Sequence, residues 1–372
     1  MTDSTLDRAR GALLGQAVGD ALGTTYEFRH IEQPVYPTLA TKPATDVIGA
    51  GPFNLPPGAI TDDTQLAVCL ARSLVERGGF DASDVAERYV AWEDEAFDVG
   101  GQTGASLRAI EKSGSTAGGM IAWRASGYQA AGNGSLMRTT PIAIAFAKAP
   151  LAELIDASIA DSMLTHADPR CALACAAHNA AIAMVLTTGS DDAVARGREM
   201  VEAARAAVNE GARRLTAMWT AGVSTVGAGD TTLPAIAIGD VDSEELALVE
   251  KARVALLHDL DKALADNPEV YGEEHADMHL YERAGFVRLA FRLAFWHAAH
   301  SPAWTDALVD VASRGGDADT NAAIVGALVG ARDGAAAIPS AWIERVLAAR
   351  QRGSDAWGEA HHPKHLLALL ET

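Results

Sequence analysis

Apolar residues three or four positions apart recur along most of the chain, and this helical period most restricts what the chain can fold into. Segments that alternate apolar and polar residues are nearly absent, and the plausible strand is the short stretch 233–238. The sequence therefore predicts an all-α protein. The segments with helical spacing are 6–23, 64–77, 83–96, 151–163, 170–187, 192–215, 243–265, 284–300, 304–313, 320–332 and 340–351.

The length and the net charge of the chain further restrict its domain organisation and the ligands it can bind. The chain has 372 residues, of which 49% are hydrophobic, so one large helical core or a domain with an insertion can be built. The formal net charge is −19 and no basic run is present, which argues against a general nucleic-acid surface. Any anionic ligand must therefore be held locally.

The N-terminal residues and the cysteines indicate the compartment. The first residues lack a hydrophobic signal region, and no uninterrupted apolar run is long enough to span a bilayer, so we expect no membrane partner. The three cysteines form no paired framework, which favours the reduced cytoplasm. Cys171 and Cys175, with His178 nearby, leave a soft-metal site open, although no second Cys/His pair is evident.

Two short acidic clusters each precede an alanine-rich helical segment. They are Thr61–Thr64, with the sequence Thr-Asp-Asp-Thr, and Asp317–Thr320, with the sequence Asp-Ala-Asp-Thr. Their oxygens are hard ligands suited to Mg²⁺ or Mn²⁺, and two helix N-termini brought together could hold a pair of ions. The alternative is that each cluster caps its helix, because Asp and Thr accept the free backbone N–H groups there.

The helix after the second cluster favours the metal interpretation. Residues 321–331 are dense in small side chains, which let helices approach closely, so we expect this helix to be central and buried. Carboxylates at its start would then carry a desolvation cost that bound cations relieve. Neither cluster has the glycine and bidentate Glu of an EF-hand. The Asp-x-Asp-Thr string also resembles haloacid-dehalogenase phosphatases, but their motif follows a buried strand near the start of the domain.

A third element is the stretch Gly132–Arg138, with the sequence Gly-Asn-Gly-Ser-Leu-Met-Arg. Two glycines around Asn133 allow backbone N–H groups to converge on an anion. Ser135 could cap the following helix, and Arg138 offers a bidentate fork for a phosphate. This combination predicts a pyrophosphate cradle, although Gly-Asn-Gly is also an ordinary turn.

Together with further motifs, these elements occur in the order seen in the ADP-ribosylglycohydrolase family, which the chain resembles over about residues 6–335. The motifs are Gly15-x-x-x-Gly19-Asp20-Ala21-Leu22-Gly23 with Glu27, Thr61-Asp62-Asp63-Thr64, Asp98-Val99-Gly100, Gly132-Asn133-Gly134-x-x-Met137-Arg138, Thr165-His166, and Gly315-Gly316-Asp317-x-Asp319-Thr320. The family includes the hydrolase that removes ADP-ribose from dinitrogenase reductase.

The resemblance implies a compact, all-helical single domain over residues 1–372 with two Mg²⁺ or Mn²⁺ ions in a central cleft. The chain is longer than the compact bacterial members, which implies a family-variable insertion at about 219–280. The implied metal ligands are Thr61, Asp62, Asp63, Asp317, Asp319 and Thr320. The implied substrate-binding residues are Gly132, Asn133, Gly134, Ser135, Arg138 and His166. The candidate acid and base carboxylates are Glu27 and Asp98. A structural role stays open for three of these: His166 as a capping or core histidine, Glu27 and Asp98 as exposed or ion-paired carboxylates.

The implied reaction is hydrolysis of the N-glycosidic bond between ADP-ribose and a protein side chain, with arginine the leading acceptor and ADP-ribose the product. Such cleavage builds oxocarbenium character, which glycosidases handle with paired carboxyl groups, and two ions could replace part of that apparatus. We expect Glu27 to orient the water or bridge the metals, and Asp98 to partner the ring oxygen or leaving group. Alternative substrates are serine-linked, O-acyl or polymeric ADP-ribose, or a small ADP-ribosylated guanidine. The sequence also leaves open a two-metal phosphohydrolase and a non-enzymatic, crystallin-like member, the latter of which would not require the intact aspartates.

Overall fold

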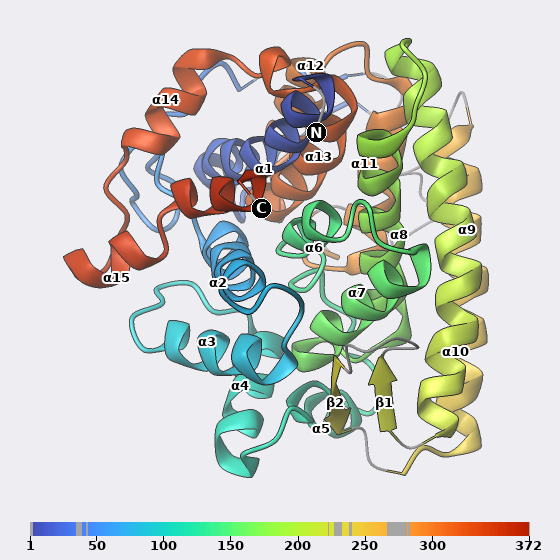
Figure 1. Cartoon of the computed structure of the whole chain (residues 1–372). Coiled ribbons are helices and arrows are strands. Elements are labelled where there is room, and N and C mark those ends of the chain that lie inside the picture. Colours follow the sequence, from blue (N-terminus) through green and yellow to red (C-terminus); the bar gives the residue numbers. More distant parts are fainter. Residues whose placement is uncertain are drawn as a thin grey trace.

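The computed structural model describes residues 3–34, 39–41, 44–221, 223–226, 233–237, 240–265, 281 and 283–371, and most of these residues are helical (Figure 1). The α-helices are α1 (Asp3–Gly23), α2 (Asp62–Arg77), α3 (Ala82–Glu93), α4 (Gly101–Ser113), α5 (Gly118–Ala125), α6 (Thr140–Ala145), α7 (Leu151–Thr165), α8 (Pro169–Thr187), α9 (Ala193–Thr220), α10 (Ser243–Leu264), α11 (Val287–His300), α12 (Trp304–Ala312), α13 (Ala318–Asp333), α14 (Ser340–Ala348) and α15 (Asp355–Ala360). Short 3₁₀ segments are η1 (Thr24–Tyr26), η3 (Ala335–Ala337) and η4 (Pro363–Leu370). The all-α prediction is confirmed.

Every segment with helical spacing overlaps one of these helices. The sequence missed α4, α5, α6 and α15, which are shorter or begin with glycines and therefore show too few apolar repeats to reveal a period. The segment predicted from residue 284 begins as a helix only at Val287, because Gly285 has a φ of +79° and cannot continue a right-handed helix.

A small hairpin interrupts the helical fold. Strands β1 (Val223–Val226) and β2 (Leu233–Ala237) pair antiparallel, with Val223 opposite Ala237. The predicted strand is thus confirmed for Leu233–Ala237, its last residue lies outside the described residues, and β1 was not anticipated. The hairpin and α10 lie within the expected insertion at about 219–280. Within this range, the residues outside the described part are 222, 227–232, 238–239 and 266–280.

Helices α1 and α13 pack backbone against backbone. In α1 the residues that face α13 are glycines four apart: Gly11, Gly15, Gly19 and Gly23. A Cβ on Gly15 would lie 2.2 Å from the carbonyl oxygen of Gly326, and one on Gly23 would lie 2.3 Å from that of Ala318. Only small residues permit this approach. As the pairs run antiparallel, the C-terminal end of α1 lies against the first turn of α13.

Helix α13 is central, as its small residues predicted. Its residues from Ala318 to Arg332 are buried, and α1, α11 and α12 surround it. In Figure 1 it lies beside α1 in the upper half of the molecule, between the peripheral α14 and the long helices α9 and α10 at the other edge. Any polar group at the start of α13 is therefore held inside the fold.

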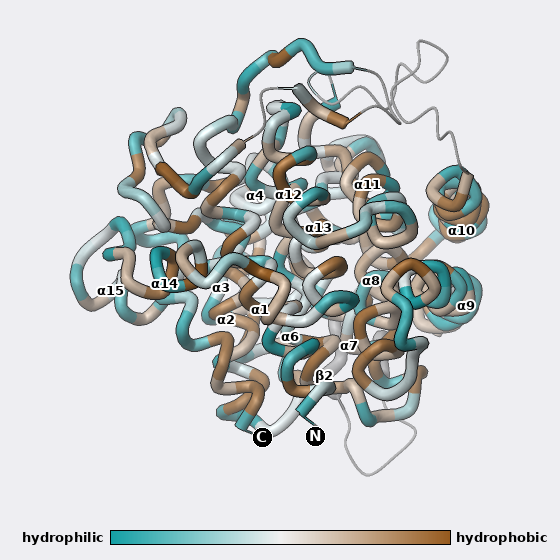
Figure 2. Tube along the Cα trace, turned by 90° about the horizontal axis from the view of Figure 1, so that it is seen from above, coloured by the Kyte–Doolittle hydropathy of each residue, from teal (hydrophilic) through white to brown (hydrophobic). Residues whose placement is uncertain are grey.

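Helix α8 is the second buried helix. By length and composition it could cross a membrane, although Arg170, His178 and Asn179 interrupt its apolar residues, but 83% of its most apolar window is buried inside the fold. It packs between α7 and α9. Figure 2 shows α9 with its hydrophobic side toward α8 and its hydrophilic side on the outer edge. Helix α8 is therefore a core helix here.

Candidate functional site

The two acidic clusters meet where α2, α13 and the C-terminal end of α1 come together. The Thr320 hydroxyl at the start of α13 donates to Asp63 Oδ2 at the start of α2, at 3.4 Å. A cavity of about 280 Å³ opens beside this contact. It is lined by Glu27, Phe28, Asp62, Asp98, Gly100, Gly101, Gln102, Thr103, Gly132, Asn133, Gly134, Met137, His166, Ala284, Gly285, Asp317, Asp319 and Thr320. Most of the predicted site residues thus lie together.

Helix capping does not explain the clusters. The residues at the N-cap positions are Thr61 for α2 and Asp317 for α13, and neither side chain accepts a hydrogen bond from a backbone N–H group of its own helix. Two acidic residues from the α1 end of the chain do this instead: Asp20 at the start of α2 and Glu27 at the start of α13. Within the clusters, Asp319 accepts one N–H of the first turn, that of Thr320 at 2.8 Å, and the N-cap side chains leave the other capping to Asp20 and Glu27.

Asp20 is a buried anchor for α2. Its carboxylate accepts hydrogen bonds from the backbone N–H groups of Thr61 and Thr64, at 3.1 and 3.2 Å, and from their hydroxyls, at 2.9 and 2.6 Å. Burial raises the pKa of Asp20 to about 6, although the four donors lower it. The sequence placed Asp20 in a family motif but gave it no role in the site.

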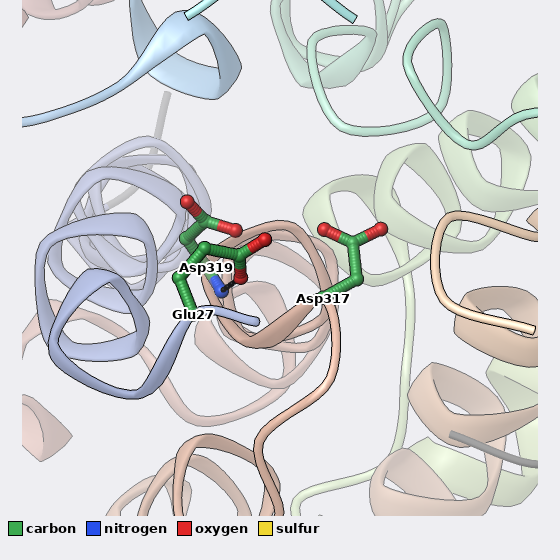
Figure 3. Close-up of side chains that lie close together, drawn as sticks. All are labelled: Glu27, Asp317 and Asp319. Carbon is green, nitrogen blue, oxygen red and sulfur yellow. Dashed lines mark hydrogen bonds between the residues drawn. The ribbon is translucent and has the colours of Figure 1, made fainter. Parts of the chain in front are cut away.

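Glu27 joins the second cluster. Its Oε2 accepts hydrogen bonds from the backbone N–H of Ala318 at 2.6 Å and of Asp319 at 3.4 Å. Figure 3 shows its carboxyl group beside that of Asp319, with Asp317 nearby, and one oxygen from each lies within 4.8 Å of the others. Burial, and then the charges of Asp319 and Asp317, raise the pKa of Glu27 strongly. The interpretation of Glu27 as an exposed or ion-paired carboxylate is therefore excluded.

The remaining carboxylates crowd the same space. Burial raises the pKa of both Asp62 and Asp63, and neighbouring carboxylates raise them further, with Asp98 the largest charge at Asp62. Asp98 is half-buried, and burial followed by the charge of Asp317 raises its pKa to about 6. The site therefore gathers acidic groups whose ionised forms destabilise one another.

These residues fit divalent cations. Asp63 Oδ1 is buried and has no hydrogen-bond partner among the described residues, so it is an oxygen left for another ligand. The donors that converge are carboxylate and hydroxyl oxygens, the types that Mg²⁺ and Mn²⁺ prefer. Positive charge at this point would also offset the repulsion that raises the pKa values.

The glycine loop is fixed to the second cluster. Asn133 Nδ2 donates to Asp317 Oδ2 at 2.6 Å, and the Asn133 N–H donates to the carbonyl oxygen of Gly285 at 2.9 Å. The Gly132 N–H donates to Gln102 Oε1 at 3.0 Å. The backbone N–H groups of Gly132 and Asn133 are therefore engaged inside the protein, so these two do not form the predicted pyrophosphate cradle. The structure places Asn133 beside a candidate metal ligand instead.

His166 forms part of the cavity wall while being almost fully buried. Its Nδ1 lies 2.8 Å from the Thr165 hydroxyl, and its ring packs so closely on the loop that a Cβ on Gly134 would lie 2.9 Å from the ring. Burial, and then the charge of Arg138, lower its pKa far below the usual value, so the imidazole is neutral. The core interpretation and the substrate-binding interpretation of His166 are both compatible with this position.

Arg138 does not reach the cavity. It is fully buried, with Nη2 2.9 Å from the Asp161 carbonyl oxygen and Nε 3.3 Å from the Asp161 carboxylate. Its guanidinium lies over the Tyr89 ring, 4.4 Å from the centroid, and Nη1 donates to the Gly134 carbonyl oxygen at 3.3 Å. The predicted phosphate fork is therefore wrong for this arrangement, because Arg138 braces the loop from behind.

Ser135 also lies behind the cavity. Its hydroxyl is fully buried, 2.9 Å from the hydroxyl of Ser162, and accepts a hydrogen bond from Cys175 Sγ at 3.5 Å. A direct contact between the Ser135 side chain and substrate is not supported by these contacts.

The cysteines near the loop do not form a metal site in the described residues. Cys171 Sγ donates to the Gly132 carbonyl oxygen at 3.2 Å, and burial raises the pKa of both Cys171 and Cys175, the latter to about 12. Burial lowers the pKa of His178 to about 3. Among the described residues, the group of His, Cys, Asp and Glu side chains close enough to share an ion is Glu27, Asp317 and Asp319, so the geometry does not support the soft-metal alternative at Cys171 and Cys175.

The start of α4 is a part of the site that the sequence did not reveal. Gly100, Gly101, Gln102 and Thr103 line the cavity, and no side chain caps this helix. The first N–H groups of a helix have no partner within it, so this turn presents donors and the positive end of the helix dipole. No Lys or Arg lies on the described lining. On the described lining, the first turn of α4 therefore offers backbone donors to an anion.

Comparison with known proteins gives consistent matches. The family model described as ADP-ribosylglycohydrolase matches residues 1–363. The ADP-ribosylarginine hydrolase Tri1 of Pseudomonas putida (strain GB-1) is 28% identical over 353 residues, covering 92% of this chain and 75% of that protein. The ADP-ribosyl-[dinitrogen reductase] glycohydrolase of Rhodospirillum rubrum is 37% identical over 173 residues, covering 46% of this chain and 55% of that protein. A solved structure of an ADP-ribosylglycohydrolase-related protein complex aligns with a TM-score of 0.64 and 26% identity over 99% of this chain and 98% of that chain.

Proposed function

The chain belongs to the ADP-ribosylglycohydrolase family, and we propose that it cleaves the bond between ADP-ribose and the guanidino nitrogen of a modified arginine in a protein. Membership makes it an enzyme that hydrolyses glycosidic bonds of ADP-ribose. One observation carries the choice of arginine: the cavity gathers carboxylates and no basic side chain on its described lining, which suits a cationic leaving group. The relative that matches 92% of this chain is itself named an ADP-ribosylarginine hydrolase.

We propose that two divalent cations, Mg²⁺ or Mn²⁺, complete the site. The residues that would hold them are Thr61, Asp62, Asp63, Asp317, Asp319 and Thr320. Glu27 would assist, because its carboxyl group shares the space between Asp317 and Asp319. Bound cations would supply the positive charge that orients the ribose hydroxyls and activates the attacking water. The unpartnered Asp63 oxygen supports this assignment.

Two carboxylates of the chain would then have separate roles: Asp98 would transfer the proton, and Glu27 would position the attacking water. Asp98 is half-buried at the cavity with a pKa raised to about 6, close to the value that suits a proton carrier near neutral pH. It would take a proton from the attacking water and deliver it to the leaving nitrogen. The bond from the anomeric carbon breaks with its electron pair on that nitrogen, and the water oxygen bonds to the carbon. Glu27, fixed by the first turn of α13, would orient the cluster and the water.

The pyrophosphate needs donors that are not already engaged. The first turn of α4, with Gly101 and Gln102, offers unpartnered helix N–H groups on the cavity lining. Gly134 lies on the same lining and can approach a phosphate closely, since it has no side chain. At about 280 Å³ the cavity is smaller than the ~300–1,000 Å³ that encloses a drug-sized ligand. We therefore expect it to enclose the reacting ribose and the phosphates, with the adenosine extending beyond it.

We also propose that residues 1–372 act as one catalytic domain. The family model spans residues 1–363, and the site draws on residues from Asp20 to Thr320. The partners implied are an ADP-ribosylated protein and the product ADP-ribose.

The decisive experiment is a substrate panel with each metal. Arginine-linked, serine-linked, O-acyl and polymeric ADP-ribose are incubated with the protein and Mg²⁺ or Mn²⁺, and released ADP-ribose is quantified by chromatography. We expect the highest kcat/KM on the arginine linkage, and loss of activity with EDTA. Asp62→Ala serves as the control for contaminating hydrolases. Faster release from a serine-linked or polymeric substrate would show that arginine is not the preferred acceptor. Full activity in EDTA would show that the reaction does not require the cations.

A further inference from the structure

Phe28 is an exposed aromatic residue on the lining of the site. Its side chain is 58% exposed, although the residue before it, Glu27, is buried in the carboxylate cluster. Large apolar side chains left in water forgo the stabilisation of burial. Phe28 therefore lines the cavity although its exposure carries a cost, and it is not part of the buried core.

The backbone at Phe28 is also unusual. Its φ is +56°, a left-handed conformation that is rare for residues other than Gly, Asn and Asp. Two backbone hydrogen bonds to Gly316 hold this conformation. The Phe28 N–H donates to the Gly316 carbonyl oxygen at 2.8 Å, and the Gly316 N–H donates to the Arg29 carbonyl oxygen at 2.9 Å. Gly316 directly precedes Asp317. The same pair of hydrogen bonds thus couples the placement of Phe28 to the second acidic cluster, and strain of this kind is typical of functional sites.

Two further rings stand behind Phe28. Its ring meets that of Phe53 edge to face with centroids 6.2 Å apart, and Phe53 meets Phe97 in the same way at 5.4 Å. Arg352 closes the row, with its guanidinium 4.9 Å from the centroid of Phe97 and Nη1 2.9 Å from the Phe53 carbonyl oxygen. Phe97 is the neighbour of Asp98. We name this row, Phe28, Phe53 and Phe97, the aromatic wall.

The chemistry of the wall suits one kind of acceptor. An aromatic face beside carboxylates attracts a planar cation through the ring quadrupole and through charge. Phe28 lies next to Glu27 and on the same cavity as Asp98. A guanidinium satisfies both attractions at once, whereas a serine oxygen, an ester or a second ribose satisfies neither. The donors that we assign to the phosphates, on α4 and at Gly134, come from other segments.

We propose that Phe28 recognises the acceptor, its ring contacting the guanidinium group of the ADP-ribosylated arginine. This inference rests on the proposed function and adds the residue that selects the arginine linkage. Phe53 and Phe97 position the ring of Phe28.

The test separates acceptor binding from ADP-ribose binding. Phe28→Leu keeps apolar bulk but removes the ring face, so KM for an ADP-ribosylarginine peptide should rise about 3- to 30-fold, the range expected from losing a cation–π contact, with little change in kcat. Affinity for ADP-ribose, measured by calorimetry, should stay within about twofold, because the product lacks the guanidinium. Phe28→Tyr should restore KM to near the wild-type value. Phe146→Leu, an aromatic residue away from the cavity, is the matched control and should change neither quantity.

Each other outcome has a clear meaning. An unchanged KM in a folded Phe28→Leu protein overturns the inference while leaving arginine hydrolysis intact. An equal loss of ADP-ribose affinity also overturns it, since Phe28 would then contact the nucleotide. Failure of Phe28→Tyr to rescue KM would assign the effect to backbone distortion at φ +56° and overturn the role of the ring. Absence of arginine-linked hydrolysis in the wild-type protein would overturn this inference and the proposed function together.

Discussion

Asp20 on α1 accepts a 2.6 Å hydrogen bond from the hydroxyl of Thr64 at the start of α2. The same carboxylate holds Thr61, while Glu27, four residues past the end of α1, holds the first turn of α13. One end of one helix therefore sets the relative positions of both acidic clusters. The glycine contacts between α1 and α13 make this geometry possible, because they bring the two backbones together.

The first prediction concerns Asp20 as a positioning residue. Asp20→Asn leaves one acceptor oxygen where two oxygens receive four hydrogen bonds, so Thr61 loses its orientation. We expect Mn²⁺ affinity to fall about 10- to 100-fold, as when an outer-layer partner of a metal ligand is lost. Calorimetric titration with Mn²⁺ measures this, with circular dichroism to verify the fold. Asp306→Asn, an exposed carboxylate, is the control, and wild-type affinity in Asp20→Asn would show that α2 is positioned without it.

A second prediction is that the two clusters bind metal as one site. Asp62→Ala and Asp319→Ala each remove a carboxylate from a different helix, and both should lose at least one ion and all turnover, because coordination becomes incomplete and charge unbalanced. Stoichiometry is measured by titration with Mg²⁺ or Mn²⁺. If both variants retain the wild-type stoichiometry, the clusters do not share a site.

A third prediction tests the contact between α1 and α13. Gly15→Ala should gain about 1 kcal/mol of helix propensity. The new Cβ would lie 2.2 Å from the Gly326 carbonyl oxygen, so the helices must separate. We expect net destabilisation of about 1–3 kcal/mol, the usual cost of overpacking. Gly79→Ala is the control, because nothing lies within 4 Å of its added Cβ and its φ is not positive. Equal urea midpoints for the two variants would contradict tight packing at Gly15.

The sequence predicted the features that repeat locally. The helical period located α1, α2, α7 to α13 and others, and the two acidic motifs were found because each begins a helix. The dense small residues of α13 correctly predicted a buried central helix. These features depend on neighbours within a few residues, which a pattern can report.

Pairings between distant segments could not be predicted in this way. Arg138 looked free in a glycine loop, but its partner Asp161 comes from α7, and only packing brings a buried aspartate to it. The start of α4 was missed because glycines conceal its period. Phe28 is recognisable only from its exposure beside Glu27. In each case the deciding quantity is burial or a tertiary contact.

A fourth prediction follows from the buried imidazole of His178 on α8. Its Nε2 has no hydrogen-bond partner among the described residues, and burial lowers its pKa from 6.5 to about 3. At a pH between these two pKa values, His178 is protonated in the unfolded chain and neutral in the folded chain. This group's contribution to stability is therefore complete above pH 6.5 and is lost as the pH falls toward 3.

Replacing His178 should accordingly flatten the pH dependence. In His178→Leu, the slope of unfolding free energy against pH should decrease by up to about 1.4 kcal/mol per pH unit between pH 6 and pH 5. Urea unfolding at half-unit intervals measures the slope, with the exposed His258→Gln as the control. A slope equal to that of the wild-type protein would mean that His178 gains a proton, or a partner, within the fold.

The last prediction separates binding from chemistry at Asp98. The residue lines the cavity but belongs to neither acidic cluster, and its pKa is raised to about 6 by burial and by Asp317. Asp98→Asn preserves shape, so metal stoichiometry should be unchanged and ADP-ribose affinity should stay within a few-fold. The rate of the chemical step should fall by about a hundredfold or more, as expected when a positioned acid or base is lost. Single-turnover release of ADP-ribose from an arginine-linked peptide at saturating Mg²⁺ measures this step. Asp94→Asn, a nearby exposed carboxylate, is the control. If Asp98→Asn instead raises KM at an unchanged rate, Asp98 only binds substrate, and proton transfer must pass through Glu27.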